Sequence, residues 1–158
     1  MEKVKNFTQI AEIVNELKRK GKKVVFTNGC FDILHSGHIK LLKKAKKLGD
    51  ILILGINKDK SIKKLKGKGR PIMNEKQRIE IISAIEFVDY VVPFGQPTPE
   101  KLIKRIKPDI IVKGGDYKKN EVIGKDIVEK YGGKVYIFPL VKNISTTKII
   151  KKIKKMEE

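Results

Sequence analysis

Residues 23–56 read KVVFTNGCFDILHSGHIKLLKKAKKLGDILILGI, and this stretch decides the fold class. It opens with residues 23–27, whose β-branched and aromatic side chains are typical of a buried strand. Residues 36–48 carry apolar side chains at helical spacing with lysines between them, and Gly49 suits the end of such a helix. Residues 50–56 are almost continuously apolar, as expected for a strand that is covered on both faces. The stretch therefore predicts a strand, a helix and a second strand.

The same alternation of strands and helices continues along the rest of the chain. Further strands are expected at residues 87–92, 108–112 and 134–139. Further helices are expected at residues 7–20, 74–85, from 98 onward, 120–131 and 145–156. The polar residues 58–71 predict a loop. Because parallel strands need helical crossovers, the pattern predicts an α/β fold, a doubly wound sheet of five parallel strands with an extra N-terminal helix.

The composition is that of a globular chain with a large excess of positive charge. Its 158 residues include 37 Lys and Arg against 18 Asp and Glu, which gives a formal net charge of +19. Such an excess attracts polyanions, so nucleic acid and nucleotide phosphates are both candidate ligands. Most lysines fall on the outer faces of predicted helices, where they solubilise the chain. A basic nucleic-acid-binding domain is the non-enzymatic alternative, but aromatic residues make up only 6% and stacking platforms are scarce.

Several sequence features bear on the cellular setting. No change of composition marks a linker, so we expect residues 1–158 to form a single domain. The apolar runs are far shorter than the roughly 20 residues that span a bilayer, and the first residues lack the apolar stretch of a signal peptide. The chain has one cysteine, Cys30, so an internal disulfide is excluded. We expect a cytoplasmic protein that has no membrane partner.

The loop after the first strand, residues 29–38, carries the strongest functional signal. It reads GCFDILHSGH and holds both histidines of the chain, His35 and His38, where a helix begins. A helix N-terminus offers free N–H groups and the positive end of the helix dipole, so it suits an anionic ligand. Imidazole N–H groups can also donate to phosphate oxygens as negative charge develops in a transition state. Gly29 suits the turn out of the strand, and Gly37 lets a ligand approach the backbone closely.

Two other interpretations of this loop stay open. In the first, His35 caps the helix and His38 packs against it, with no ligand involved. In the second, Asp32, His35 and His38 hold a metal ion, although the nearby lysines oppose a cation. We expect no metal site. We interpret Cys30 as a packing residue rather than a nucleophile, because Asp32 beside it does not favour a thiolate.

Three further loops are expected at the same edge of the sheet, because ligands of such folds bind at the carboxyl ends of the strands. Residues 57–70 are rich in lysine and glycine and can fold over a triphosphate, and Arg78 on the next helix offers a planar fork to phosphate oxygens. In residues 112–117, VKGGDY, the glycines expose backbone to a ligand. In residues 144–149, ISTTKI, hydroxyl side chains precede a helix. The sequence lacks a P-loop and a G-x-G-x-x-G motif after the first strand.

Two of these segments resemble the signatures of a known superfamily. The pattern Gly29-x-Phe31-Asp32-x-x-His35-x-Gly37-His38 resembles the H-x-G-H signature of the cytidylyltransferase-like nucleotidyltransferases. Residues 144–147, ISTT, resemble the second signature of that superfamily. Within it, residues 26–35, 65–71 and 112–117 are similar to the adenylyltransferase domains of ADP-heptose synthases. The resemblance covers essentially the whole chain.

The resemblance implies a Rossmann-like nucleotidyltransferase fold and a specific reaction. In it, ATP and D-glycero-β-D-manno-heptose 1-phosphate give ADP-heptose and pyrophosphate, for lipopolysaccharide core biosynthesis. It implies Mg²⁺ as the cofactor that accompanies ATP. A separate heptose kinase is expected to supply the sugar 1-phosphate, and a homodimer is common among such proteins.

Two alternatives share the same fold, namely glycerol 3-phosphate cytidylyltransferase and FMN adenylyltransferase. The glycerol enzymes carry an arginine just before the ISTT segment, where this chain has residues 140–143, LVKN. This departure argues against the glycerol substrate and leaves Lys142 as a substitute for that arginine.

The predicted site follows from the motifs and the resemblance together. His35, His38 and Lys66 are the expected catalytic residues, with Lys66 and Arg78 holding the β- and γ-phosphates. Residues 114–117 are expected to frame the base and ribose, and residues 145–147 to bind phosphate from the opposite side. The expected nucleotide-binding residues are Asn28, Gly29, Cys30, Phe31, Asp32, His35, Gly37, His38, Arg78, Lys113, Gly114, Gly115, Asp116, Tyr117, Ser145, Thr146 and Thr147.

Overall fold

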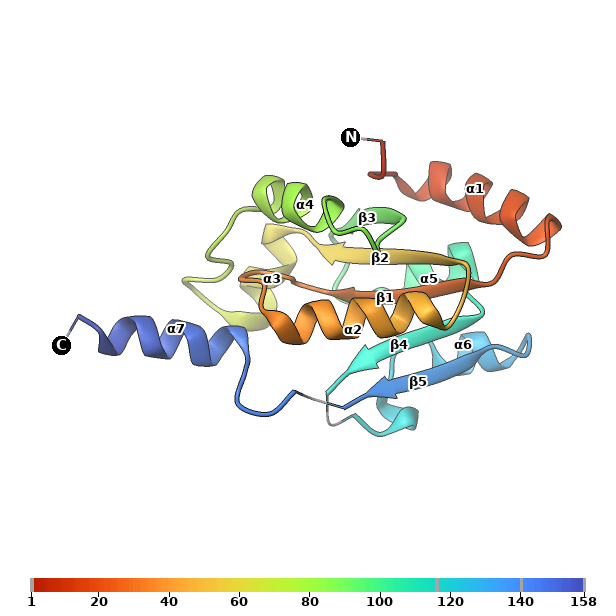
Figure 1. Cartoon of the computed structure of the whole chain (residues 1–158). Coiled ribbons are helices and arrows are strands. Elements are labelled where there is room, and N and C mark those ends of the chain that lie inside the picture. The colour runs from red at the N-terminus through yellow and green to blue at the C-terminus, as the bar shows by residue number, and fades with distance from the viewer. Residues whose placement is uncertain (1, 116, 140, 158) are drawn as a thin grey trace.

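The computed structural model describes residues 2–115, 117–139 and 141–157, and it confirms an α/β fold around a five-stranded parallel sheet (Figure 1). The strands are β1 (Val24–Gly29), β2 (Ile51–Asn57), β3 (Tyr90–Phe94), β4 (Ile110–Gly114) and β5 (Lys134–Phe138). They lie in the order β3-β2-β1-β4-β5, and each neighbouring pair is parallel. The direction of winding reverses between β1 and β4, which is the switch point where ligands of such folds bind.

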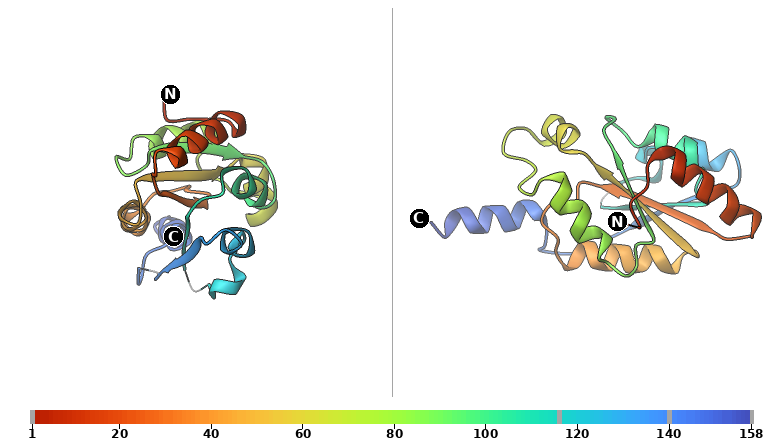
Figure 2. Two further views of the ribbon diagram at one scale, coloured as in Figure 1. Left: turned by 90° about the vertical axis from the view of Figure 1, so that its right-hand side faces the viewer. Right: turned by 90° about the horizontal axis from the view of Figure 1, so that it is seen from above.

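Helices cover both faces of this sheet (Figures 1 and 2). They are α1 (Phe7–Arg19), α2 (Ser36–Lys47), α3 (Asp59–Lys66), α4 (Glu75–Ser83), α5 (Glu100–Ile106), α6 (Lys125–Glu129) and α7 (Thr146–Lys155). On one face, Ile10 of α1, Leu102 of α5 and Val128 of α6 belong to one buried apolar cluster. On the other face, Leu42 of α2 and Ile82 of α4 belong to a second cluster. The extra N-terminal helix is therefore part of one covering layer.

The segment after β2 differs from the sequence prediction. Residues 58–71 were expected to form a loop, but α3 occupies their first half. The helix buries Ile62 and Ser61, carries Asp59 in its first turn and lysines in its last, and ends at Gly67 with a φ of +84°. These are ordinary helix-start and helix-end signals, which the high lysine content obscured.

The helix expected at residues 120–131 is also shorter than predicted. The structure has a 3-10 turn at Lys119–Glu121 and then α6, with Gly124 between them. Gly124 has a φ of +94°, and a Cβ at this position would lie 2.7 Å from Cδ1 of Ile103. The chain therefore turns tightly against α5 here, and a continuous helix cannot pass through this point.

Helix α7 begins at the sheet edge and extends away from it, as Figure 1 and the right-hand view of Figure 2 show. None of its ten residues is buried, and Ile153 is 52% exposed. Among the described residues, no helix is both long enough and apolar enough to cross a membrane.

Candidate active site

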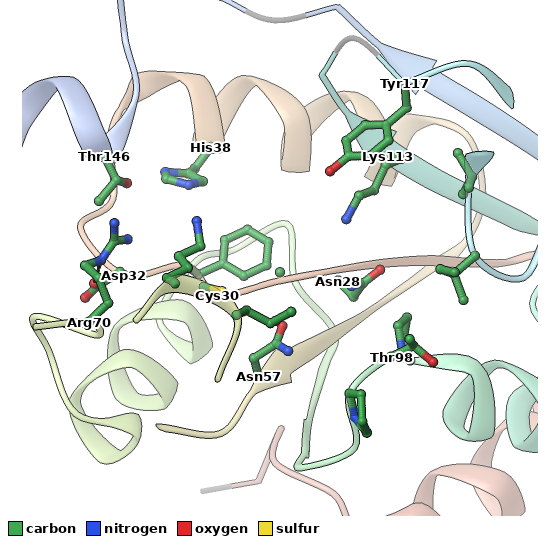
Figure 3. Close-up of a pocket in the computed structure, with 18 of the residues that line it drawn as sticks. Asn28, Cys30, Asp32, His38, Asn57, Arg70, Thr98, Lys113, Tyr117 and Thr146 are labelled. Atoms are coloured by element: carbon green, nitrogen blue, oxygen red, sulfur yellow. Dashed lines mark hydrogen bonds and ion pairs between the residues drawn. The ribbon is translucent and has the colours of Figure 1, made fainter. Parts of the chain in front are cut away.

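A cleft follows the carboxyl edge of the sheet around the switch point between β1 and β4 (Figure 3). It has two adjoining lobes of about 560 Å³ and about 340 Å³. We call the larger one the α5-side lobe, because Thr98 and Pro99 at the start of α5 line it, and the smaller one the α2-side lobe, because Leu41 of α2 lines it. The residues that line both lobes are Asn28, Gly29, Cys30, Phe31, His38, Lys66, Lys113 and Thr146. These residues define the junction of the lobes.

The two histidines lie at the start of α2 with their hydrogen bonds fixed. His35 is the N-cap residue of α2, and its Nδ1 accepts a hydrogen bond from the Gly37 N–H at 3.1 Å. Nδ1 of His38 accepts one from the His35 N–H at 3.2 Å. A neutral imidazole whose Nδ1 is an acceptor carries its proton on Nε2. His35 therefore has the capping role that was left open, and this role is compatible with ligand binding because the cap uses Nδ1 rather than the Nε2–H.

Burial keeps this pair uncharged. It lowers the pKa of His38 to about 4, and the neighbouring His35 and Lys66 act in the same direction. Burial also lowers the pKa of His35. The two ring centroids are 3.9 Å apart, so a charge on both rings at once would be costly. Near neutral pH the site therefore presents two neutral N–H donors.

Three cationic side chains surround the same place. Lys66, at the end of α3, and Lys113, on β4, line both lobes, and Arg70 lines the α5-side lobe. Within the described part of the chain, Arg70 alone of the three forms an ion pair, with Asp32. Burial lowers the pKa of Lys113, an effect that Cys30 opposes and Lys66 reinforces. An anionic ligand at the junction would relieve the electrostatic cost of these clustered cations.

Asp32 lines the α5-side lobe and holds a backbone segment in place. It is 3% exposed, and its Oδ2 accepts hydrogen bonds from Arg70 Nε at 3.1 Å and from the Ile72 N–H at 2.8 Å. Its Oδ1 accepts one from the Met73 N–H at 2.9 Å. Asp32 thereby fixes Arg70 at the wall of the cleft (Figure 3).

Arg78 is not placed where the sequence predicted. Its side chain is fully buried, and its three donor nitrogens bind Met73 O at 3.0 Å, Cys30 O at 2.7 Å and Asp59 Oδ1 at 2.8 Å. It lines neither lobe. The expectation that Arg78 holds phosphate is therefore wrong, and its hydrogen bonds instead join α3, α4 and the end of β1. A guanidinium near a lysine-rich segment suggested a phosphate ligand. Its N–H donors can also bind buried backbone carbonyls, as they do here.

The two signature segments meet at the cleft. Thr146 Oγ1 donates a hydrogen bond to the carbonyl of Ile33 at 2.9 Å, across 113 residues of chain. Ser145 caps α7, because its Oγ accepts from the Lys148 N–H at 3.1 Å. A Cβ on Gly37 would lie 3.6 Å from Cγ2 of Ile144. The start of α7 therefore closes the α2-side lobe opposite the start of α2.

Most of the residues predicted from sequence come together here. Those that line at least one lobe are Asn28, Gly29, Cys30, Phe31, Asp32, His35, Gly37, His38, Lys66, Lys113, Gly114, Gly115, Tyr117, Ser145, Thr146 and Thr147. Asp116 lies outside the described residues. One expected grouping is divided, because Gly114 and Gly115 line the α2-side lobe whereas Tyr117 lines the α5-side lobe.

Sequence reasoning included the segment that starts at Asn57 but missed the wall that follows β3. Asn57 ends β2, and residues 97–99 follow β3. The order of the elements already indicated this wall. Because parallel strands end at one edge of the sheet, the loop after the third strand is expected at the same edge as the other loops. Leu65, Arg70 and Ile144 belong to segments that were expected at this edge. The lining residues outside the expected segments are Leu41, Glu121, Val122, Ile123, Phe138, Pro139 and Val141.

The geometry does not suit a metal ion bound by protein ligands. Nδ1 of His35 and Nδ1 of His38 are occupied as acceptors, and the carboxylate of Asp32 is shared between Arg70 and two backbone N–H groups. No group of three or more His, Cys, Asp or Glu side chains that could hold a metal occurs among the described residues. These residues therefore offer no ligand set for Mg²⁺.

The fold and the cleft define a class of protein. A parallel sheet with imidazole donors, lysines and two helix starts around one switch point is typical of α/β proteins that bind nucleotide phosphates. Residues 26–152 match the Cytidylyltransferase-like family model. The chain belongs to this family and is a nucleotidyltransferase.

Curated relatives agree with this assignment. The bifunctional protein HldE of Geobacter metallireducens is 52% identical over 151 residues, which are 96% of this chain and 31% of that protein. HldE of Geobacter sulfurreducens is 50% identical over 153 residues. The chain thus spans about a third of the length of these relatives.

Two solved structures have the same fold. The lipopolysaccharide core biosynthesis protein of Thermoplasma volcanium is 37% identical, with a TM-score of 0.63, and the match covers 78% of this chain and 100% of that chain. A pantoate-beta-alanine ligase from Francisella tularensis has a TM-score of 0.62 at 22% identity, which supports the fold alone.

Proposed function

We propose that the chain transfers an adenylyl group from ATP to D-glycero-β-D-manno-heptose 1-phosphate. A phosphate oxygen of the sugar 1-phosphate attacks the α-phosphorus of ATP, the bond from that phosphorus to the bridging oxygen breaks, and pyrophosphate leaves. The products are ADP-heptose and pyrophosphate. No covalent enzyme intermediate is needed, so the work of the protein is to position two anions and stabilise the charge that develops between them.

The observation that carries this proposal is the paired histidine cap. The sugar phosphate is largely dianionic near pH 7, so the nucleophile needs no general base. What the reaction does need is hydrogen-bond donation to the α-phosphate as its charge redistributes. His35 and His38 have Nδ1 engaged with backbone and Nε2–H free, and their lowered pKa values keep them neutral. They are suited to donate and unsuited to accept a proton.

The cations around the histidines suit the remaining phosphates. Lys66 lies beside His38, close enough to influence its pKa, and lines both lobes. Arg70 is held at the cleft wall by Asp32 and takes over the phosphate-binding role first expected of Arg78. The opposing helix start at Thr146 adds N–H groups on the other side. In this proposal Mg²⁺ would accompany ATP and help to neutralise its phosphates, because the described residues offer no ligand set of their own.

The substrate class rests on resemblance. The KGGDY segment is similar to the heptose branch of the family, and a solved relative is named a lipopolysaccharide core biosynthesis protein. A kinase reaction must supply the sugar 1-phosphate, on a separate protein or on a longer polypeptide. A homodimer and a cytoplasmic location stay predictions.

The test is pyrophosphate release, measured with ATP or CTP against heptose 1-phosphate, glycerol 3-phosphate and FMN, each with Mg²⁺. Turnover with ATP and the heptose alone is the expected result. Turnover with a different pair would keep the nucleotidyltransferase assignment and replace the substrate. A Lys47→Ala variant, changed at an exposed position at the end of α2, is the matched control and should keep full activity.

A further inference from the structure

The faces of the sheet on which the strand ends present their side chains help to distinguish the two lobes. Along a strand, successive side chains alternate between faces, so residues two or four positions apart share one. Asn28, Asn57 and Lys113 therefore emerge on the face that α1, α5 and α6 cover. Each of them lies two or four positions after a residue of the same strand that is buried in the apolar cluster of that face. These buried residues are Phe26, Ile53 and Ile111. Of these three residues, Asn57 lines the α5-side lobe alone, whereas Asn28 and Lys113 line both lobes.

The α2-side lobe has the chemistry of a base-binding site. Away from the junction, it is lined by apolar side chains, among them Leu41, Phe138 and Val141. The Gly114–Gly115 backbone lines the same wall without side chains of its own, and the Gly115 N–H donates to the Phe138 carbonyl at 3.0 Å. A flat, weakly polar ring that is read by backbone groups fits such a wall. This lobe also holds the starts of α2 and α7, which favour phosphate at the junction.

The α5-side lobe has a different chemistry. Asn28, Asn57 and Thr98 come from the ends of β1 and β2 and the turn after β3, and all three line it (Figure 3). Asn57 is 5% exposed, and its Nδ2 donates to Ser61 Oγ at 3.3 Å, which orients the amide. Thr98 Oγ1 accepts from the Glu100 N–H at 3.4 Å, so its own hydroxyl proton is available to a ligand. Amides and hydroxyls that both donate and accept are the groups that match sugar hydroxyls.

An aromatic ring completes this lobe. Tyr117 is 46% exposed and lines the α5-side lobe, and the Lys113 ammonium lies 5.3 Å from its ring centroid. In Figure 3, Tyr117, Asn28 and Thr98 lie on one side of the cleft, well separated from Arg70 and Thr146 on the other. Lys113, which lines both lobes, reaches between the phosphate-binding end and this polar end.

We propose that the α5-side lobe binds the polyhydroxyl part of the acceptor, with Asn57 and Thr98 reading its hydroxyl groups and Tyr117 packing against it. Lys113 holds the acceptor phosphate at the junction, where it faces the α-phosphate of ATP. This rests on the proposed function and adds the residues that select a sugar over a short acceptor such as glycerol 3-phosphate. It also moves Tyr117 from the base and ribose to the acceptor.

The test compares two variants with two readouts. Asn57→Leu replaces a hydrogen-bonding side chain with an apolar one of similar size, and Tyr117→Ala removes a ring that is 46% exposed. Each is expected to raise KM for the sugar 1-phosphate by about tenfold or more. The Kd for ATP, from calorimetry without acceptor, is expected to stay within about twofold of the unmodified protein. Val141→Ala, in the other lobe, is the matched control and should weaken ATP binding without raising KM for the sugar.

The outcomes separate this inference from the proposed function. If the unmodified protein turns over no sugar 1-phosphate at all, the proposed function fails and this inference fails with it. If it does turn one over, but Tyr117→Ala weakens ATP binding and leaves KM for the sugar unchanged, the proposed function stands and the lobe assignment is overturned. Should Asn57→Leu fail to fold, the result with Tyr117→Ala decides.

Discussion

At the scale of single residues, the site depends on which hydrogen bonds the ring nitrogens of two histidines form. Each Nδ1 accepts from backbone, which fixes ring orientation and tautomer and leaves Nε2–H for a ligand. His38 is the more deeply placed of the pair, because it lines both lobes whereas His35 lines one. A donor at the lobe junction contributes most to the transition state, where charge moves between two bound anions.

Removing the His38 donor should therefore affect the chemical step. His38→Ala is expected to lower kcat by about a hundredfold or more, the usual scale for the loss of one such donor. Steady-state pyrophosphate release would measure it, with the Lys47→Ala variant as reference. A kcat that stays undiminished would contradict the assigned role.

The lowered pKa of His38 also predicts how stability depends on pH. An unfolded histidine takes up its proton near pH 6.5, whereas the folded His38 does so near 4. Between these values the unfolded chain binds more protons, so the contribution is complete above pH 6.5 and is lost as the pH falls toward 4. Urea unfolding from pH 7.5 to 4.5 should show a steeper loss of stability for the unmodified protein than for His38→Gln. Parallel curves would mean that the histidine titrates normally.

Gly37 tests whether the cap positions the imidazole. A Cβ there would lie 2.9 Å from both Cε1 and Nδ1 of His35. Gly37→Ala should displace that ring and lower kcat about tenfold or more, on the scale of lost transition-state hydrogen bonding. Gly95→Ala is the matched control, because the added methyl would make an ordinary 3.6 Å contact with Lys58. Equal activity in the two variants would argue against a precise imidazole position.

At the scale of elements, the segment between α3 and α4 behaves as a wall pinned by one carboxylate. Three hydrogen bonds from Arg70, Ile72 and Met73 converge on Asp32. Arg78 ties the same region to the end of β1 through the Cys30 carbonyl. The segment carries exposed Gly67 and Gly69, so without these bonds little would hold it against the cleft.

The Asp32→Asn variant isolates this role. The amide has the size of the carboxylate, but its NH₂ group cannot accept a hydrogen bond from Arg70 or from a backbone N–H. The substitution also removes the charge that pairs with Arg70. The expected cost is about 1.5–3 kcal/mol of unfolding free energy, the range for hydrogen bonds to charged groups. KM for ATP should rise as Arg70 leaves the wall. Urea denaturation and steady-state kinetics measure the two effects, and unchanged hydrogen exchange at residues 70–73 would contradict them.

At the scale of the whole molecule, the net charge of +19 attracts any polyanion, and the cleft brings together cationic side chains and N–H donors that suit a small one. Long-range attraction is screened within about 10 Å at 0.1 M salt, whereas contacts inside a partly buried site are screened less. This difference separates a nucleotidyltransferase from a nucleic-acid-binding domain, because binding of nucleic acid through many phosphates falls steeply with salt.

Salt titration therefore provides a direct comparison. Raising NaCl from 50 to 300 mM should weaken binding of single-stranded DNA by about a hundredfold or more, while kcat/KM for ATP falls by about tenfold or less. Fluorescence anisotropy and pyrophosphate release give the two curves. Tight DNA binding that persists at high salt would favour a nucleic-acid function.

The alternation of strands and helices was predictable because it depends on local patterning. The apolar run at residues 50–56 predicts a buried strand, and the amphipathic pattern at residues 36–48 predicts a helix. The order of such segments implies a parallel sheet. The first loop was also predictable, since both histidines lie within four residues of each other at a helix start. Helix α3 was missed because its lysines outweighed its two apolar residues, of which Ile62 is buried and Leu65 is exposed.

By itself, the sequence determined the fold class, the edge of the sheet at which ligands bind and most of the residues that lie there. The tertiary structure decided what each of them does. It extended β1 and β4 so that Asn28 and Lys113 stand on strands, because neighbouring strands supply hydrogen bonds that no local pattern encodes. It buried Arg78 and put Tyr117 and Gly115 into different lobes. The face of a sheet on which a side chain emerges, and the partners that compete for its hydrogen bonds, depend on contacts between residues distant in sequence.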